Sequence, residues 1–295
     1  MSLPNFICLG AAKSGTTTLY DILRQHPEIY IPSFKEPHFF DIPENYKNGI
    51  DWYKKNYYRN ALARVIADFT PSYFFEKEAP KRIFDHLGKD VKFIVLLRHP
   101  VDRAYSHFLH SIRDEHENLS FIDSLISEKD RLQTFEKEGD YLSYLRNSYS
   151  LQGQYGDMLE RYLKYYSLEN FLFIHFEEEF IAKRDQTIQR VLNFLQIKND
   201  VKLKTDLKSN PASKEKSKSL KRLMKKKAGW RSILKFMIPS VQLRQIIRNR
   251  IQRLNTKEFK AGKITLELKS ELYHKYFKSS VVKFENLSKK KMNWK

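Results

Sequence analysis

The chain has 295 residues, 41% of them hydrophobic, which is enough to build a large core without disulfide or metal support. Its single cysteine, Cys8, excludes an internal disulfide and is typical of a reducing compartment. The net charge of +19, from 54 basic and 35 acidic residues, predicts an anionic partner: nucleic acid, anionic lipid, acidic glycan or anionic cofactor. No apolar run reaches membrane-span length and no cleavable signal is visible, so we expect a soluble, cytoplasmic protein.

The chain begins with an apolar strand that leads into a loop of small and hydroxylated residues. Residues 6–9 predict the strand, Gly10 ends it, and a helical pattern follows over 18–25. Backbone N–H groups converge on anions at such a helix N-terminus, and the helix dipole adds partial positive charge. An ordinary glycine-containing turn is the alternative, but the hydroxyl-rich run from Ser14 to Thr18 favours phosphate binding.

The same loop differs from the nucleoside-triphosphate P-loop, which reads G-x-x-x-x-G-K-[ST]. Gly10 and Gly15 keep the spacing, but Thr16 occupies the position of the lysine that reaches the β- and γ-phosphates. The only lysine, Lys13, lies inside the loop. We therefore expect a 5′-phosphate with a substituent attached rather than a triphosphate–metal complex.

Strands and helices alternate along residues 1–203. Further apolar runs predict strands over 65–69, 91–97 and 171–175. Helices are predicted over 79–87, from Pro100 onward, over 155–166 and over 187–195. Residues 114–147 read as a polar, mobile segment around one weak helix. The alternation predicts an α/β, P-loop-like fold of three layers, with a central parallel sheet flanked by helices.

The C-terminal third is strongly basic. Residues 204–219 predict a loop rich in serine and lysine, and helices are predicted over 220–227, 246–254 and 266–277. A solvated helix face explains such a charge run by itself. We predict that residues 1–295 form a single domain, with an α/β core over 1–203, the basic loop, and a helical, basic part over 220–295.

Polar residues follow two of the predicted strands. Arg98 comes directly after the most apolar strand, so we expect it at the carboxyl edge of the sheet, where ligands collect in open α/β folds. Ser106 follows two helical turns later, and a guanidinium with a hydroxyl suits a phosphate. A strand-end arginine and a helix-face serine without a ligand are the alternative. Whether Ser72 and Tyr73, after the strand at 65–69, contact substrate or only form a turn stays open.

Ionisable residues cluster in the segment Lys35-Glu-Pro-His-Phe-Phe-Asp41. Glu36, His38 and Asp41 lie on an irregular stretch that prolines hold, and rigid loops with ionisable groups are natural positions for general bases. The alternative is that these are solvent-exposed loop residues without a catalytic role. A metal site needs three convergent ligands, and no second cluster of His or Cys has a usable spacing, so we expect no metal.

In combination these motifs resemble the sulfotransferases that use 3′-phosphoadenosine 5′-phosphosulfate as sulfate donor. The nearest branch contains the heparan sulfate glucosaminyl sulfotransferases and their bacterial relatives. The matching motifs cover nearly the whole chain: Lys13-Ser-Gly-Thr-Thr-Thr-Leu, Lys35-Glu-Pro-His-Phe-Phe-Asp, Asp51-Trp-Tyr, Thr70-Pro-Ser-Tyr-Phe, Leu97-Arg-His-Pro-Val-Asp-Arg-Ala-Tyr-Ser, Gly153-Gln-Tyr, Phe194-Leu and Asn293-Trp. The first motif and the one from Arg98 to Ser106 are the specific ones.

The resemblance implies a set of residues that bind the donor nucleotide. The loop residues that would bind the 5′-phosphosulfate are Lys13, Ser14, Gly15, Thr16, Thr17 and Thr18. Lys13 would also contact the bridging oxygen, while Arg98 and Ser106 would bind the 3′-phosphate. Within the basic loop, the residues that would fold over the nucleotide are Ser213, Lys214 and Lys216.

The resemblance also implies the chemistry. Glu36 would take the proton from an acceptor hydroxyl or amine, with His38 assisting or substituting for it. Sulfuryl transfer is in-line and needs no Mg²⁺, because the donor carries no polyphosphate to neutralise. A glycan or glycolipid is the expected acceptor. Phe69 stands where the glycosaminoglycan enzymes have a lysine on the substrate side, which argues against a heparan-like acceptor.

Two other classes of function remain as alternatives. One is a P-loop kinase or nucleotide hydrolase, which Thr16 argues against. The other is a non-enzymatic, basic polyanion-binding protein, which the motif-rich first third argues against. We expect no specific nucleic acid partner. Peripheral contact of the basic C-terminal region with anionic membrane is a further option.

Overall fold

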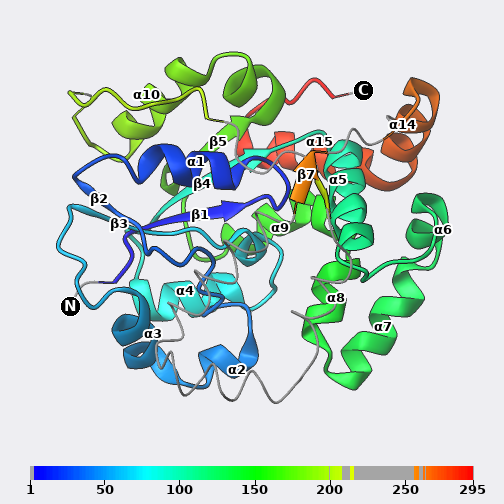
Figure 1. The fold of residues 1–295 in the computed structure, drawn as a ribbon, viewed down its shortest axis with the longest axis horizontal. Helices are drawn as coiled ribbons and strands as arrows, with labels where there is room; N and C mark the ends of the chain where they lie inside the picture. The colour runs from blue at the N-terminus through cyan, green and yellow to red at the C-terminus, as the bar shows by residue number, and fades with distance from the viewer. Residues whose placement is uncertain are drawn as a thin grey trace. The chain divides into compact units, whose positions relative to one another are not determined.

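The computed structural model describes residues 3–198, 200–207, 213–215, 256–258, 262 and 264–294. The chain divides into two compact units, one comprising Met1–Ser209 with Ile264–Lys295 and the other Asn210–Lys263. The first unit contains a five-stranded sheet, and its helices and strands are labelled in Figure 1. No helix among the described residues is both long and apolar enough to cross a membrane.

The sheet is parallel throughout. Its strands are β1 (Phe6–Gly10), β2 (Ile29–Tyr30), β3 (Val65–Asp68), β4 (Lys92–Leu97) and β5 (Phe171–His175). Their spatial order is β2-β3-β1-β4-β5, and every neighbouring pair is parallel. On one side of β1 lie β3 and then β2, and on the other side lie β4 and then β5. The order therefore reverses between β1 and β4, and the carboxyl ends of these two strands define the crevice in which such folds bind ligands.

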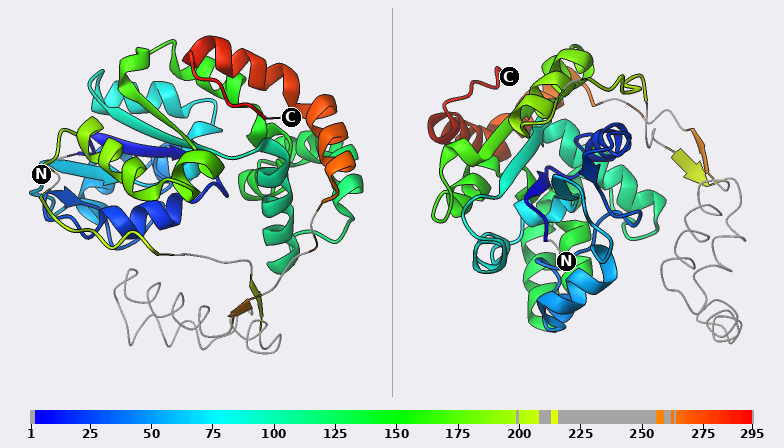
Figure 2. Two further views of the ribbon diagram at one scale, coloured as in Figure 1. Left: turned by 90° about the horizontal axis from the view of Figure 1, so that it is seen from above. Right: turned by 90° about the vertical axis from the view of Figure 1, so that its left-hand side faces the viewer.

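Both faces of the sheet are buried, which explains the nearly continuous apolar runs of its central strands. Along β1, Ile7 and Leu9 pack on one face, while Phe6 and Cys8 pack on the other. The first face is covered by α4 (Ala79–Leu87), α9 (Tyr155–Tyr162) and α15 (Lys278–Ser288). The second face is covered by α1 (Thr16–Leu23) and α10 (Arg184–Phe194), so the unit has three layers (Figures 1 and 2).

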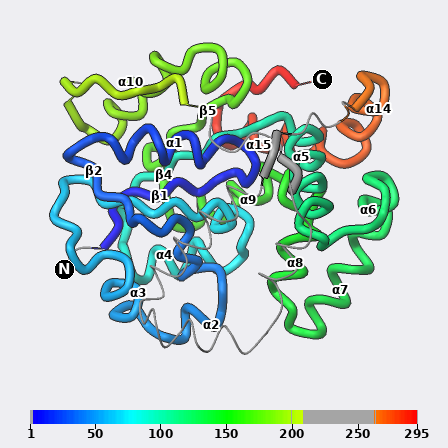
Figure 3. The backbone as a smooth tube through the Cα atoms, viewed as in Figure 1, coloured from blue at the N-terminus to red at the C-terminus, as the bar shows by residue number. Residues whose placement is uncertain are grey.

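Segment 114–147 was predicted to contain one weak helix, and that prediction is wrong; its predicted mobility stays a prediction. Its three helices are α6 (Phe121–Ile126), α7 (Glu128–Glu138) and α8 (Tyr141–Asn147), which Figure 3 shows following one another after α5 (Pro100–Arg113). Side-chain caps stabilise α6 and α8, because Ser120 accepts a hydrogen bond from the Asp123 N–H and Asp140 accepts one from the Ser143 N–H. Three apolar residues of α6 and α5 then pack together: Phe121, Leu125 and Phe108.

The predicted fold class is confirmed, and the differences lie in the small elements. The helix at 79–87 and the strand at 171–175 have the predicted bounds, whereas α1 begins two residues before the prediction. The sequence did not indicate β2, nor the helices α2 (Pro43–Tyr46), α3 (Gly49–Tyr57) and α15. The helix predicted over 266–277 is α14 (Leu266–Leu272) followed by a π-helical turn, η5 (Tyr273–Phe277).

Two of the predicted helices, over 220–227 and 246–254, lie outside the described residues. The second unit contributes one described element, an antiparallel pair of β6 (Ser213–Glu215) and β7 (Thr256–Glu258). That residues 1–295 form a single domain stays a prediction.

Candidate active site

The loop between β1 and α1 has the backbone geometry of an anion cradle. Gly15 is the N-cap of α1 and has a φ of 87°, in the left-handed region that favours glycine. A Cβ at Gly15 would lie 2.7 Å from the Phe176 ring and 3.0 Å from the Phe180 ring. Gly10, at the other end of the loop, has a φ of 143°, and its Cβ would lie 2.8 Å from the Pro71 carbonyl oxygen. Only glycine fits both ends of this loop.

The loop also presents a buried side-chain donor that has no partner among the described residues. The Ser14 hydroxyl is buried, and within the described residues it has no hydrogen-bond partner. The first N–H groups of α1 likewise have no helical partners at this end, because a helix begins there. A buried hydroxyl without a partner costs free energy unless a ligand satisfies it. These atoms therefore fit the phosphate or sulfate group of a bound anion.

Arg98 lies against this loop, as its position after β4 predicts. Its Nη1 donates a hydrogen bond of 3.2 Å to the carbonyl oxygen of Lys13, and its guanidinium lies 5.4 Å from the centre of the Phe176 ring. Its buried Nε has no partner within the described part of the chain. Ser106 is half-buried in α5, the helix that begins two residues after Arg98. The structure thus gives Arg98 free donor capacity beside the loop.

The segment from Lys35 to Asp41 forms the second part of the site. Glu36 has a φ of 65° and His38 a φ of 52°, so both non-glycine residues adopt the left-handed conformation. His38 lies between two carboxylates, with Nδ1 at 2.7 Å from Asp41 Oδ2 and Nε2 at 3.6 Å from Glu36 Oε2. Lys35 forms an ion pair with Glu36.

Ser72 completes this chain of side chains. Its hydroxyl donates to Asp41 Oδ2 over 2.5 Å and lies 3.3 Å from His38 Nδ1. Asp41 is fully buried, so its carboxylate depends on these partners and on the backbone N–H of Ile42. The sequence left open what Ser72 contacts, and the structure places it in the series Ser72–Asp41–His38–Glu36.

The ionisation states in this series follow from its charges. Burial lowers the pKa of His38, but Asp41 and Glu36 raise it more, to about 10. Burial raises the pKa of Glu36, yet Lys35 and His38 together hold it well below its ordinary value. At neutral pH, Glu36 is therefore a carboxylate and His38 an imidazolium. In these states Glu36 can accept a proton and His38 cannot.

The charges on Lys13 show that the two loops face one site. Burial and, second, the positive charge of Arg113 lower the pKa of Lys13, while Asp114 and Glu36 act against this shift, and the resulting pKa is about 8. Lys13 itself lowers the pKa of His110, after the larger effect of burial. The loop after β1, the Lys35–Asp41 segment and the end of α5 therefore lie close enough for their charges to interact.

The end of α5 is the part of the site that the sequence analysis missed. His110 and Arg113 follow Ser106 on the same helix at spacings of four and seven residues. Those spacings place the three residues on one helix face. Once Ser106 had been assigned to the site, this periodicity could have identified the other two.

Three predicted nucleotide contacts are not tested by the structure. Ser213 and Lys214 belong to β6 in the second compact unit, and Lys216 lies outside the described residues. Their role over the nucleotide stays a prediction. Among the residues that the structure does describe, no group of three or more His, Cys, Asp or Glu side chains could hold a metal ion. That the reaction needs no metal also stays a prediction.

Comparison with known proteins identifies the family. Residues 3–238 match the family model described as the sulfotransferase domain, so the chain belongs to that family and the predicted resemblance is confirmed. A crystal structure of a sulfotransferase from Alicyclobacillus acidocaldarius superposes with a TM-score of 0.70 and 26% identity, covering 99% of this chain and 98% of that one. The α/β architecture of the first unit is therefore that of a sulfotransferase.

The relatives in sequence are heparan sulfate glucosamine 3-O-sulfotransferases. The mouse 3B1 enzyme is 34% identical over 196 residues, which cover 66% of this chain and 47% of that protein. The human enzyme 6 is 31% identical over 198 residues, covering 67% of this chain and 54% of that protein. The chain thus spans about half the length of these relatives.

Proposed function

We propose that this chain is a sulfotransferase that transfers the sulfuryl group of 3′-phosphoadenosine 5′-phosphosulfate to a hydroxyl of a glycan or glycolipid. The environment of Lys13 carries the proposal. Its carbonyl oxygen accepts a hydrogen bond from Arg98, and the charge of Glu36 acts on its ammonium. A nucleotide site and a proton acceptor therefore meet at one residue of the loop after β1.

The donor side is formed by the loop and by α5. Lys13, Ser14 and the threonines of α1 would hold the 5′ end of the donor, while Arg98 and Ser106 would hold its 3′-phosphate. The donor supplies an activated sulfuryl group. Ammonium and hydroxyl donors at the loop stabilise negative charge as it develops on the leaving phosphate. The unpartnered Ser14 hydroxyl supports this assignment, because such a donor needs an acceptor.

The acceptor side is formed by the Lys35–Asp41 segment. Glu36 is ionised at neutral pH and is our candidate for the general base that takes the proton of the acceptor hydroxyl. His38, held by Asp41, lies next to Glu36 and orients the carboxylate. An imidazolium in this place also keeps Glu36 ionised until the acceptor binds. In this proposal Glu36 is the general base, and His38 orients it and stabilises its charge.

A glycan acceptor is supported by the relatives, whose names specify transfer to heparan sulfate glucosamine. This chain differs from the glycosaminoglycan enzymes at Phe69, on the acceptor side. It is 1% exposed and packs edge-on against Phe6 and Tyr20, at 5.7 and 5.6 Å between ring centres. The lysine that the resemblance expects at this position is therefore replaced by a core residue. We propose a glycan or glycolipid hydroxyl whose recognition does not need that cation.

Calorimetric binding of adenosine 3′,5′-bisphosphate tests the donor site. The wild type should bind, and Arg98→Ala should weaken binding by about tenfold to a hundredfold, since charge-assisted hydrogen bonds contribute about 1.5–3 kcal/mol. Arg64→Ala is the matched control, because Arg64 is exposed next to the amino-terminal end of β3. Folded wild type that does not bind this nucleotide would contradict the proposal. Labelled donor, offered with neutral glycans, glycolipids and heparan sulfate, then identifies the acceptor.

A further inference from the structure

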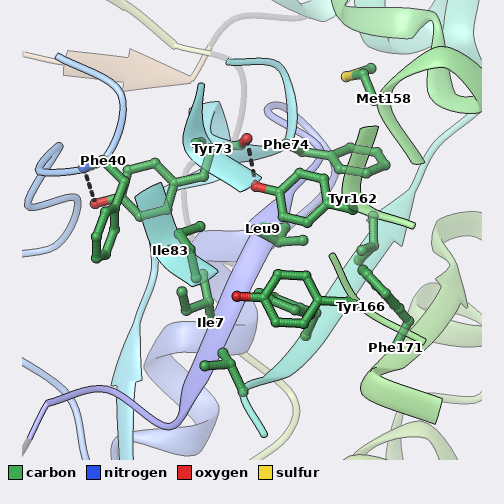
Figure 4. Packing of buried hydrophobic residues seen from close by; sticks show 14 of the residues in the cluster. Ile7, Leu9, Phe40, Tyr73, Phe74, Ile83, Met158, Tyr162, Tyr166 and Phe171 are labelled. Atoms are coloured by element: carbon green, nitrogen blue, oxygen red, sulfur yellow. Dashed lines mark hydrogen bonds between the residues drawn. The ribbon is translucent and has the colours of Figure 1, made fainter. Parts of the chain in front are cut away.

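Tyr73 binds the backbone of the segment that carries the candidate base. Its hydroxyl oxygen accepts hydrogen bonds from the N–H of Phe39 at 2.9 Å and of Phe40 at 3.4 Å. Figure 4 shows the bond to Phe40, together with the bond of 2.8 Å in which the Tyr162 hydroxyl donates to the Tyr73 carbonyl oxygen. Tyr73 is fully buried, so it cannot touch a substrate from this position.

Asp68 fixes the direction of the Tyr73 hydroxyl. The Tyr73 O–H lies 3.1 Å from Asp68 Oδ2, and an ionised carboxylate can only accept. Tyr73 must therefore point its proton at Asp68, which leaves its oxygen lone pairs for the two backbone N–H groups. Burial raises the pKa of Asp68 to about 6, against the hydrogen bonds from its hydroxyl partners, so the group is mostly ionised at pH 7.

The segment that Tyr73 holds is strained. Glu36 and His38 both have positive φ, and for non-glycine residues such a conformation costs about 1–3 kcal/mol each. It persists only where the surroundings determine it. Phe39 and Phe40 follow His38 directly, so the hydrogen bonds to Tyr73 act on the neighbouring peptide groups. The side-chain amide of Asn45 adds a bond of 2.8 Å to the His38 carbonyl oxygen.

We propose that Asp68 and Tyr73 are positioning residues of the transfer reaction, which hold Glu36 and His38 in their left-handed conformation through the backbone of Phe39 and Phe40. The inference rests on the proposed function for its effect on turnover. It goes beyond that function by assigning a role to a buried carboxylate and phenol that never meet the substrate. A purely structural role is the competing explanation, since both side chains belong to the core.

Tyr53 offers a matched control. Its hydroxyl donates to the same oxygen of Asp68 over 2.5 Å, and its side chain is equally buried. Its ring stacks on Phe39 at 4.5 Å between centres, and a phenylalanine at position 53 would keep that contact. Tyr53→Phe and Tyr73→Phe each remove one buried hydroxyl from Asp68, but only Tyr73→Phe removes the acceptor of the loop N–H groups.

Two measurements separate positioning from stability. We expect Tyr73→Phe to lower kcat about tenfold or more, because misplaced catalytic groups lose rate steeply, while adenosine 3′,5′-bisphosphate binds within about twofold of wild type. The second measurement is the NMR titration of the His38 ring. In Tyr73→Phe its pKa should fall from about 10 toward 6.5, since His38 leaves its carboxylate partners. Tyr53→Phe should keep both wild-type values despite a similar loss of stability.

The proposal is overturned if Tyr73→Phe and Tyr53→Phe give the same kcat and the same His38 titration. If the wild type transfers sulfate to no acceptor, the proposed function fails, yet the His38 titration still decides whether Tyr73 holds the segment. Should Tyr73→Phe not fold, Asp68→Asn replaces it. An amide nitrogen there would donate to the Tyr73 oxygen in competition with Phe39, so we expect kcat and the His38 pKa to fall together. Wild-type values in that variant would equally overturn the proposal.

Discussion

Arg98 and Lys13 are joined by a hydrogen bond of 3.2 Å from the Arg98 Nη1 to the Lys13 carbonyl oxygen. The bond links the end of β4 to the loop after β1, across the point where the strand order reverses. It uses the backbone of Lys13 rather than its ammonium, and it holds the Arg98 guanidinium against the loop. In the proposed complex, this one contact would fix the spacing between the groups that hold the two ends of the nucleotide.

Gly15→Ala should destabilise the protein and weaken nucleotide binding. The added Cβ would lie 2.7 Å from Phe176, the ring against which Arg98 packs, and the φ of 87° would strain any other residue. We expect adenosine 3′,5′-bisphosphate to bind at least about tenfold more weakly, because the loop and Arg98 must both shift. Calorimetry gives the affinity, and urea unfolding gives the change in stability.

Gly49→Ala separates strain from crowding. Gly49 has a similar φ of 80°, but a Cβ there would meet nothing within 4 Å. We expect Gly49→Ala to lower the free energy of unfolding by about 1 kcal/mol, the cost of a positive φ, and to leave the nucleotide affinity unchanged. Equal effects of the two substitutions would show that the contact between Gly15 and Phe176 has no role.

Lys13 should make nucleotide binding depend on pH. Burial first and Arg113 second lower its pKa to about 8, so its ammonium is lost as the pH rises past that value. An anion binds the charged form better, so affinity for adenosine 3′,5′-bisphosphate should fall by up to about tenfold between pH 7 and pH 9. Lys13→Arg keeps its charge over this range and should give a flatter profile. Identical profiles for the two proteins would exclude Lys13 as the titrating group.

The sequence was sufficient for four of the five strands and for the places of Arg98 and the loop after β1, for a physical reason. A central parallel strand is buried on both faces, so β4 reads as an apolar run whose end is visible. The residue after that end must lie at the carboxyl edge, which placed Arg98. The loop after β1 needs glycine at two strained positions, and these are also visible in a sequence. Such features depend on local backbone geometry alone.

The remaining parts of the site depend on contacts between distant segments. Tyr73 reaches Phe39 across 34 residues, and Ser72 reaches Asp41 across 31, so neither bond leaves a local pattern. The same holds for α5, whose last turn approaches Lys13 only because β1 and β4 are neighbours. In segment 114–147, α6 and α8 were missed because they are short, at six and seven residues, and begin at side-chain caps. Tertiary packing determines the Tyr73 and Ser72 contacts and the approach of α5 to Lys13.

Glu36→Gln should separate binding from chemistry. The amide keeps the size of the side chain but cannot take a proton, so we expect turnover to fall by about two orders of magnitude or more. Affinity for adenosine 3′,5′-bisphosphate should stay within a few-fold, because the donor ligands are unchanged. Initial rates with labelled donor and calorimetry provide the two values. Glu28→Gln, near the amino-terminal edge of the sheet, should behave as wild type. Near-normal turnover in Glu36→Gln would exclude Glu36 as the general base.

His38 should make the stability of the folded protein decline with pH. Its pKa is about 10 in the folded state against an ordinary 6.5, so its stabilising effect is complete below pH 6.5 and is lost as the pH rises toward 10. Because the folded state holds up to one proton more than the unfolded state, the free energy of unfolding falls by up to about 2 kcal/mol as the pH rises from 6.5 to 8. The imidazole is 27% exposed, and solvent screening keeps the change below that upper value.

The comparison of wild type with His38→Gln isolates this effect. Urea unfolding at several pH values between 6.5 and 8 should show a stability difference that shrinks as the pH rises. Above pH 8 the stability of the wild type no longer reports His38 alone. Lys13 has a lowered pKa of about 8 in the folded protein, so it adds stability as the pH rises. His274→Gln, at an exposed position in the C-terminal π-helical turn, should keep the wild-type slope. Parallel curves for wild type and His38→Gln would mean that folding does not raise the pKa of His38, and Lys35 would then be the cation that keeps Glu36 ionised.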